Sequence, residues 1–315
     1  SDPPPATLSP FFLTRLLREA WGFEGLIYTE AMDMGAVVSR YGARDAAVRA
    51  LEAGADVILM PPDPEGAIAA VREGRLSRQR LDASVRRLLV AKARVGLHRE
   101  RDVPIDRVSE VVAARAHQAF ADTAAARSLV LARDRERLVP LVEPGRRRVL
   151  SVTFARRVDL AAGRTFDRLL RPAVGRLERA RLEYESPAAA YDSAAARGLE
   201  ADLVLVSAYV SPLEGSGTIS LPAGMGRLVE RVRSAGVPVV VLSFGNPYLL
   251  DLFPEVGSYL LAWGGREVSQ RAAVRALLGR APIGGRLPIS LPPHHERGEG
   301  LVRQASEVGE VGARP

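Results

Sequence analysis

Short apolar runs alternate with amphipathic helical patterns along most of the chain, and this alternation constrains the fold more than any other feature. In the first part of the chain, two buried strands are predicted at residues 25–29 and 56–60. Helical patterns surround them at residues 10–20, 43–53, 65–73 and 77–96, the last of which has Ser77 as its N-cap. Such alternation is typical of a parallel sheet covered by helices, and it predicts an α/β fold.

The same alternation resumes in the second part, after a polar stretch that contains Pro104. Strands are predicted at residues 128–131, 148–154, 202–207, 237–243 and 259–262, with helices at 157–171, 188–197, 224–234 and 267–278. The polar C-terminal residues predict a flexible tail. The resulting division has four segments: an α/β region at 1–96, a linker and helix at 97–126, a second α/β region at 127–293 and the tail at 294–315.

Composition excludes several classes of protein. With 315 residues, 47% of them hydrophobic and 26% charged, the chain is globular and long enough for about two domains. No apolar run approaches the ~20 residues that a membrane-spanning helix needs. The chain has no cysteine, which excludes thiol catalysis and cysteine zinc sites, and no two of its four histidines have the spacing of a helical zinc motif. We therefore expect no metal.

The net charge of +7 raises the question of nucleic-acid binding, but the distribution of charge argues against it. Lys92 is the only lysine among 44 basic residues, and the arginines are scattered among acidic residues. Only residues 146–148 form a tight basic run, and no basic stripe is interleaved with aromatic side chains that could stack on bases. We predict that the chain does not bind nucleic acid.

A series of short motifs gives the sequence a more specific character. In the first part these are Pro5-Ala6-Thr7-Leu8-Ser9-Pro10, Trp21-Gly22-Phe23-Glu24-Gly25, Thr29-Glu30-Ala31-Met32-Asp33-Met34-Gly35-Ala36, Ala53-Gly54-Ala55-Asp56 and Met60-Pro61-Pro62. In the second part they are Ser243-Phe244-Gly245-Asn246-Pro247-Tyr248, Trp263-Gly264-Gly265 and the run from Pro282 to Pro292. In their order and spacing, these motifs resemble glycoside hydrolase family 3, and specifically its bacterial β-N-acetylhexosaminidase branch.

The resemblance covers residues 4–293 and implies an architecture. It implies that residues 1–96 are the last two strand–helix units of a TIM-like catalytic barrel, and that residues 127–293 are the C-terminal α/β sandwich domain of the family. Two units cannot close an eight-stranded barrel and would leave a strand edge open. Because the chain also opens on Ser1 rather than methionine, we expect a truncated chain, a reading frame that begins too late, or a partner that supplies the missing N-terminal barrel segment.

The resemblance also implies a retaining hydrolase that removes terminal β-N-acetylglucosamine, without a cofactor, from a carbohydrate such as a peptidoglycan or chitin fragment. A retaining enzyme needs a carboxylate that attacks the anomeric carbon. The family carries an aspartate there, and the matching residue of this chain is Glu30. Its extra methylene shifts the carboxylate by about 1 Å, which can cost on the order of 100-fold in rate. Glu30 is therefore either a working nucleophile in a reshaped pocket or the remnant of a lapsed site.

Other residues carry weaker assignments. The same motifs add Met34 and Asn246 as substrate-binding candidates, whereas Asp33 falls on a non-catalytic position. The resemblance implies a histidine as acid/base on an earlier barrel loop, and no such stretch exists in this chain. His98, His117, His294 and His295 are predicted to be surface residues. Glu214, in a glycine-containing loop, is a further acid/base candidate.

Two other functions stay open at this stage. The chain could be a non-catalytic glycan-binding or structural module with a lapsed active site. The sheet pattern alone would also fit a nucleotide-binding, flavodoxin-like domain, although a fold does not determine function. The sequence leaves open the natural substrate, the compartment and the oligomeric state.

Overall fold

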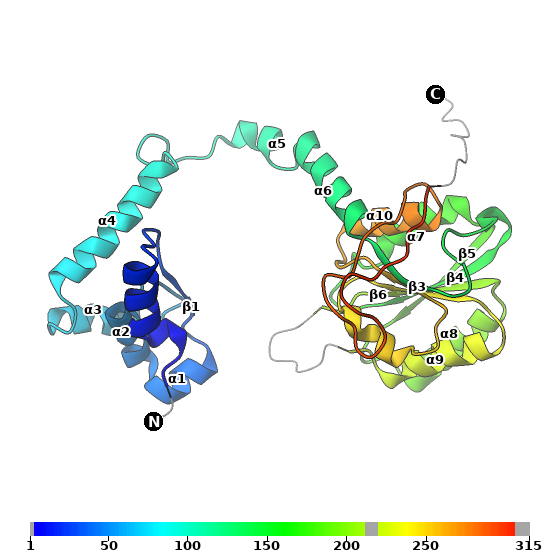
Figure 1. Ribbon diagram of the computed structural model, residues 1–315, viewed down its shortest axis with the longest axis horizontal. Coiled ribbons are helices and arrows are strands. Elements are labelled where there is room, and N and C mark those ends of the chain that lie inside the picture. The colour runs from blue at the N-terminus through cyan, green and yellow to red at the C-terminus, as the bar shows by residue number, and fades with distance from the viewer. Residues whose placement is uncertain (1–2, 212–219, 306–315) are drawn as a thin grey trace. The chain divides into compact units, whose positions relative to one another are not determined.

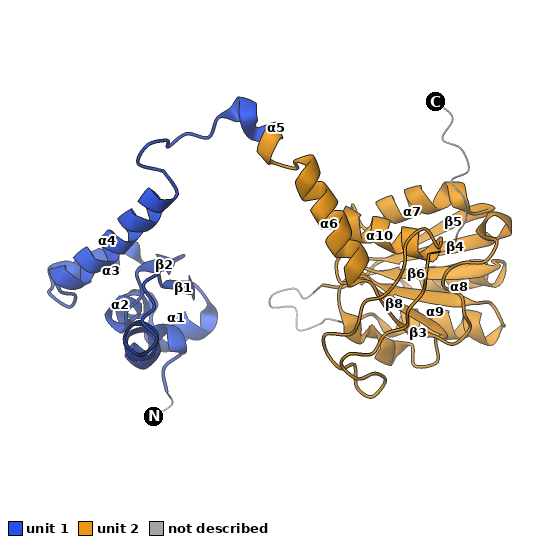
Figure 2. Ribbon diagram, turned by 45° about the horizontal axis from the view of Figure 1, so that its top comes forward, with its two compact units in different colours: residues 1–108 blue, residues 109–315 orange. Residues whose placement is uncertain are grey.

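The computed structural model describes residues 3–211 and 220–305, and the chain divides into two compact units, residues 1–108 and 109–315 (Figure 2). Strands and helices alternate in both units, so the predicted α/β class is confirmed. Residues 97–126 were predicted to form a separate linker and helix. This prediction is wrong for the helix, α6 (Arg115–Ser128), which is not separate from the second unit. This helix belongs to the second unit, in which its Asp122 forms an ion pair with Arg271 at 2.8 Å.

The first unit is built around two short parallel strands, β1 (Tyr28–Ala31) and β2 (Val57–Leu59). Tyr28 pairs with Val57, and Ala31 pairs with Leu59. The remaining elements are η1 (Ala6–Leu8), the π-helical η2 (Phe11–Ala20), α1 (Gly35–Tyr41), α2 (Ala43–Ala53), α3 (Pro64–Arg72), α4 (Arg78–Arg94), η3 (Ile105–Arg107) and α5 (Val108–Val111). The predicted cap of the long helix is confirmed, because Ser77 Oγ accepts a hydrogen bond from the Arg80 amide at 3.2 Å.

Small residues of α2 form the core of the first unit. Ala46 and Ala50 are fully buried and pack against Ile27 and Met32, which flank β1 on either side. An alanine-rich face lets the helix lie close to the strands. The strands are covered incompletely, because Tyr28 is 52% exposed and Leu59 is 41% exposed.

The second unit is a six-stranded sheet in the order β3-β8-β7-β6-β4-β5, in which β3 is antiparallel to β8 and all other pairs are parallel. The strands are β3 (Val130–Asp134), β4 (Arg148–Phe154), β5 (Arg176–Leu182), β6 (Leu203–Ala208), β7 (Val239–Ser243) and β8 (Ser258–Leu261). The other elements are η4 (Pro144–Arg146), α7 (Arg164–Leu170), η5 (Arg171–Ala173), α8 (Ala188–Leu199), α9 (Ala223–Ser234), η6 (Pro247–Leu252) and α10 (Glu267–Leu277).

The sheet of the second unit separates two apolar cores. Figure 1 shows α7 and α10 over one face and α8 and α9 over the other. Fully buried Phe166 and Phe244 belong to the first core, and Phe154 and Met225 belong to the second. Because apolar cores cover both faces, the central strands read in sequence as continuous apolar runs, which is why they could be predicted.

Two features of the second unit differ from the sequence-based expectations. Strand β5 was not predicted, because its arginine-rich sequence lacks the apolar alternation of a covered strand. The predicted flexible tail at 294–315 is wrong for residues 294–305. Their backbone bridges Leu131 through Leu301 and Ile283 through Arg303, so these residues are held by the sheet domain. Residues 306–315 lie outside the described part of the chain.

Candidate functional site

Glu30 lies on β1, close to its carboxyl end, with an exposed side chain. Its Oε1 accepts a hydrogen bond from the amide of Ala31 at 3.1 Å. Parallel pairing brings the carboxyl ends of β1 and β2 to the same edge of the sheet, where β2 is followed by Met60. Barrel enzymes place their catalytic residues at this edge. Glu30 is therefore an accessible carboxylate at a position where a substrate could approach it.

The backbone around Glu30 is fixed from both sides. The Thr29 side chain is buried, and its Oγ1 accepts a hydrogen bond from the Leu59 amide at 3.0 Å. The amide of buried Met32 donates to the Leu59 carbonyl, also at 3.0 Å. Met60, the residue that follows β2, has a left-handed backbone with φ of 44°. Hydrogen bonds of its neighbours on both sides therefore hold the backbone at Glu30 against β2.

Asp56 is a second carboxylate near β2, and its surroundings identify it as structural. Its side chain is fully buried. It accepts hydrogen bonds from the guanidinium groups of Arg18 and Arg87, the latter at 2.8 Å, and from the Ile27 amide at 3.0 Å. The Ser84 hydroxyl donates to the same carboxylate. With all these donors around it, Asp56 ties η2, the start of β1 and α4 together rather than facing a substrate.

No role was predicted for Asp56 from the motif that contains it, although the sequence carried a signal that it is structural. A lone acid next to a buried strand, in a region rich in arginine, needs partners when the chain folds. Burial lowers the pKa of the Arg18 guanidinium, although the Asp56 carboxylate partly offsets this effect. Burial likewise lowers the pKa of Arg80, which lies 3.8 Å from Asp56.

The other predicted residues of the first unit follow Glu30 closely in the chain. Asp33 is exposed in the turn after β1. Met34 is 40% exposed and is the N-cap residue of α1, where it makes no side-chain cap. Glu30 and Met34 therefore lie on either side of the short turn that joins β1 to α1. Asn246 belongs to the other unit.

Asn246 follows β7 and is only 8% exposed. Its Oδ1 accepts a hydrogen bond from the Tyr248 amide at 3.0 Å and so caps η6. Its backbone amide donates to the Val210 carbonyl at 2.7 Å, and its carbonyl accepts from Ser243 Oγ at 2.6 Å. These bonds give Asn246 a structural role at the carboxyl end of the sheet.

A cleft of about 800 Å³ lies nearby, at the carboxyl ends of β4, β6, β7 and β8. Its lining includes Tyr209, whose ring stacks on Phe244 and whose pKa is raised by burial. Arg156 and Asp159, also in the lining, pair with each other at 2.8 Å. Ligands of open α/β sheets bind in such clefts, where the strand order reverses.

The histidines divide into two pairs. His98 and His117 are exposed, as predicted. The surface prediction is wrong for the other pair: the side chains of His294 and His295 are 16% and 13% exposed. His294 Nε2 lies 3.0 Å from an Asp251 carboxylate oxygen, and His295 Nδ1 lies 2.9 Å from Glu299. Hydrogen bonding from His295 lowers the pKa of Glu299.

Two further surveys cover only the described residues. Within residues 3–211 and 220–305, no three acidic or histidine side chains gather where they could hold a metal ion. In the same part of the chain, every helix is too short or too polar to span a bilayer. Glu214, the other acid/base candidate, lies outside the described residues.

Comparison with known proteins adds to this geometry. Residues 1–91, which include Glu30, match the family model described as the glycosyl hydrolase family 3 N terminal domain. Residues 1–91 of the chain therefore belong to glycoside hydrolase family 3. The matched residues all lie within the first unit.

Two curated relatives have glycosidase names. A β-N-acetylglucosaminidase/β-glucosidase from Cellulomonas fimi is 27% identical over 297 residues, which cover 90% of this chain and 52% of the relative. A β-hexosaminidase from Methylococcus capsulatus is 37% identical over 101 residues, which cover 31% of this chain and 29% of the relative. The chain thus spans about half the length, or less, of these relatives.

The fold has solved counterparts in the same family. A family 3 β-N-acetylglucosaminidase from Paenibacillus sp. is 23% identical, with a TM-score of 0.76. The match covers 90% of this chain and 54% of that structure. At this identity the match establishes a similar fold and nothing finer.

Proposed function

We propose that this chain is the C-terminal part of a retaining β-N-acetylhexosaminidase in which Glu30 is the nucleophile. The observation that carries the proposal is the place of Glu30: an exposed carboxylate at the carboxyl end of a parallel strand, within the region that matches the family model. The first half of the name of the Cellulomonas fimi relative, β-N-acetylglucosaminidase/β-glucosidase, supports a substrate with terminal β-N-acetylglucosamine, and the name of the Methylococcus capsulatus relative supports a β-hexosaminide.

The incomplete cover of the first sheet supports the idea that further strands complete it. Parallel strands are normally buried on both faces. Here Tyr28 and Leu59 keep about half of their surface exposed, and Met60 is 64% exposed. We propose that β1, β2 and their helices are the last two units of a TIM-like barrel. The remaining units, and with them the acid/base residue, would come from a segment outside this chain.

The chemistry at Glu30 would follow the retaining course. Its carboxylate attacks the anomeric carbon while an acid protonates the leaving oxygen, and water then hydrolyses the glycosyl ester. Glutamate reaches further than the aspartate of the family, so the sugar must sit about 1 Å further from the strand. The hydrogen bond from Ala31 to Oε1 leaves Oε2 as the attacking oxygen.

Met34 enters this proposal as a sugar contact. Met34 offers an exposed apolar side chain four residues after Glu30, suited to the apolar face of a sugar ring. Asn246 belongs to the second unit, where its side-chain oxygen caps η6, and its contact with substrate stays a prediction. Met34→Ala should raise KM and leave kcat close to the parent value, because such a contact is made equally in the ground and transition states. An unchanged KM would remove Met34 from the site.

The proposal is tested on the protein extended upstream in its natural reading frame. Release of nitrophenol from 4-nitrophenyl N-acetyl-β-glucosaminide is measured for the parent, Glu30→Gln and Glu30→Asp, with the β-glucoside as the second substrate. We expect turnover of the N-acetyl substrate by the parent and a loss of at least about 1000-fold in Glu30→Gln, since the nucleophile is removed. Preference for the glucoside would refute the substrate assignment.

A lapsed site is the second candidate function, and the replacement of aspartate by glutamate favours it. In that case the chain would serve as a glycan-binding or structural module. The same experiment separates the two candidates. A folded, extended protein that turns over neither substrate, in the parent or in Glu30→Asp, would establish the module and overturn the enzyme.

A further inference from the structure

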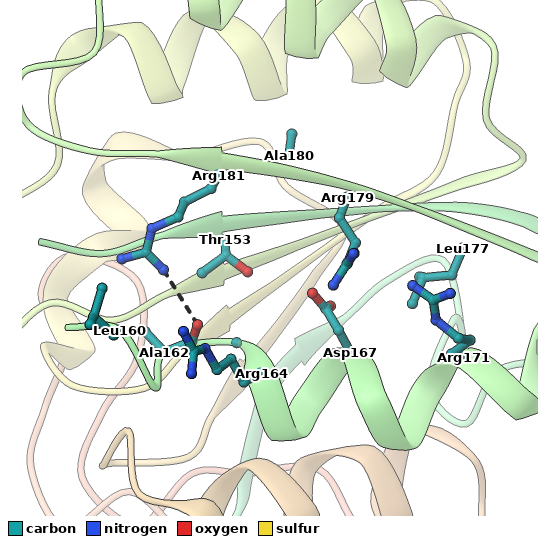
Figure 3. Close-up of a pocket in the computed structure, with 11 residues that line it drawn as sticks. Thr153, Leu160, Ala162, Arg164, Asp167, Arg171, Leu177, Arg179, Ala180 and Arg181 are labelled. Atoms are coloured by element: carbon teal, nitrogen blue, oxygen red, sulfur yellow. Dashed lines mark hydrogen bonds between the residues drawn. The ribbon is translucent and has the colours of Figure 1, made fainter. Parts of the chain in front are cut away.

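The second unit contains a polar pocket of about 570 Å³ between α7 and β5 (Figure 3). Arg164, Asp167 and Arg171 reach it from α7 and the residue after it, and Arg179 and Arg181 reach it from β5. Thr153, at the end of β4, is also part of the lining. All of these residues belong to residues 109–315, so the pocket is described within one unit.

The pocket exists because β5 places arginines where a covered strand would place apolar residues. Side chains alternate between the two faces of a strand, so Leu177, Arg179 and Arg181 share the face toward α7. Strand β5 is at the edge of the sheet, paired only with β4. Figure 3 shows Arg179 and Arg181 extending from the strand toward α7, with Asp167 facing them.

Arg181 has a structural task. Its guanidinium donates hydrogen bonds to the carbonyls of Arg156 and Asp159 at 3.0 and 3.3 Å, and to that of Ala162 at 3.5 Å. It also pairs with Glu183 at 3.3 Å. These bonds hold the segment between β4 and α7 and shape one end of the pocket.

The other three arginines form no close ion pair with a described residue, although the charges of Arg179 and Arg171 act on Asp167 at longer range. Among the described residues, no carboxylate lies within 4 Å of the guanidinium groups of Arg164, Arg171 and Arg179. The one acid of the pocket, Asp167, is 9% exposed and accepts a hydrogen bond from Ser151 Oγ at 2.7 Å. Burial raises the pKa of Asp167, which the Ser151 hydrogen bond and the charges of Arg179 and Arg171 partly offset. The pocket therefore carries an excess of positive charge.

We propose that this pocket binds a small phosphorylated ligand, whose phosphate lies among Arg164, Arg171 and Arg179. A guanidinium presents a planar fork of donors that matches the oxygens of a phosphate, and such charge-assisted bonds are among the strongest hydrogen bonds in proteins. The volume of 570 Å³ leaves room for a group the size of a sugar beside the phosphate. The proposal concerns the second unit alone and does not depend on Glu30.

Isothermal titration calorimetry on the 315-residue chain tests the proposal. The probes are inorganic phosphate and glucose 6-phosphate in 150 mM sodium chloride, which screens attraction by the net charge of the chain. We expect one saturable site per chain. Arg171→Gln and Arg179→Gln should each raise the dissociation constant about tenfold or more, because each removes charge-assisted hydrogen bonds.

Arg176→Gln is the matched control. Arg176 is on the same strand but faces away from the pocket, where it pairs with Glu178 at 2.9 Å, and its removal lowers the net charge by the same amount. We expect its affinity for both probes to equal that of the parent. Absence of saturable binding in the parent would overturn the proposal. So would an equal loss of affinity in Arg176→Gln and Arg179→Gln, which would show that overall charge attracts the anion. Circular dichroism confirms that each variant is folded.

Discussion

Asp56→Ala should destabilise the first unit more than any surface change. The carboxylate is fully buried, and three arginines surround it: Arg18, Arg87 at 2.8 Å and Arg80 at 3.8 Å. Their side chains are 13%, 32% and 25% exposed, so water compensates them only in part when the carboxylate is gone. Removing one member of a buried ion pair costs about 3–5 kcal/mol. The equilibrium constant for unfolding should therefore rise by about two to four orders of magnitude.

Asp45→Ala is the control for this prediction. Asp45 also pairs with two arginines, Arg49 and Arg75, but its side chain is 33% exposed. Solvent screens such a pair, and its removal should cost about 0–1 kcal/mol. The two substitutions thus remove the same chemical group from arginine partners and differ in burial.

Hydrogen exchange measured by mass spectrometry along a urea series gives the free energy of unfolding for each unit separately. Peptides that cover β2 and α4 report on the first unit, and peptides that cover β6 and β7 serve as the internal reference. We expect Asp56→Ala to weaken protection in the first unit alone. A loss of stability no larger than that of Asp45→Ala would refute the view that Asp56 ties η2, β1 and α4 together.

Two smaller predictions concern the second unit. A Cβ on Gly285 would lie 2.2 Å from the Leu129 carbonyl oxygen, whereas one on Gly284 would meet nothing within 4 Å. Gly285→Ala should therefore lower the free energy of unfolding by about 1–3 kcal/mol in urea denaturation, and equal losses in Gly284→Ala would contradict this reasoning. Hydrogen bonds from Arg148 lower the pKa of the Asp202 carboxyl from 3.8 to about 2. The pKa of Asp202 is thus lower in the folded state than in the unfolded state. The ion pair therefore stabilises the unit above about pH 4 and loses this effect as the pH falls toward 2. An NMR titration that places the Asp202 pKa near 4 would exclude the interaction.

The central strands of the second unit could be predicted because apolar runs mark strands that are covered by neighbouring elements. Strand β5 could not, since an edge strand tolerates charged residues and its sequence, from Arg176 to Leu182, contains three arginines and a glutamate. The tail was mispredicted for a different reason. Residues 294–305 are polar, but their backbone bonds to the sheet domain do not depend on apolar side chains.

The candidate site, like the fold, could be predicted from the sequence only in part. A motif of consecutive residues identified Glu30 as a candidate, and in the structure it lies near the carboxyl end of a parallel strand. The arginine pocket was invisible in the sequence, because Arg171 and Arg179 meet only when α7 packs beside an unpredicted strand. The partners of Asp56 could not be predicted either, because Arg18 and Arg87 lie 38 and 31 residues away from it along the chain.

The central claim is that Glu30 forms a covalent bond to the sugar, and trapping that bond tests it most directly. The protein extended upstream in its natural reading frame is incubated with a fluorinated N-acetylglucosamine derivative that forms the glycosyl ester faster than it loses it, and is then digested and analysed by mass spectrometry. The account predicts one added sugar, on the peptide that contains Glu30, and none in Glu30→Gln. A sugar on any other carboxylate, or an unlabelled protein that still hydrolyses the substrate, would contradict it.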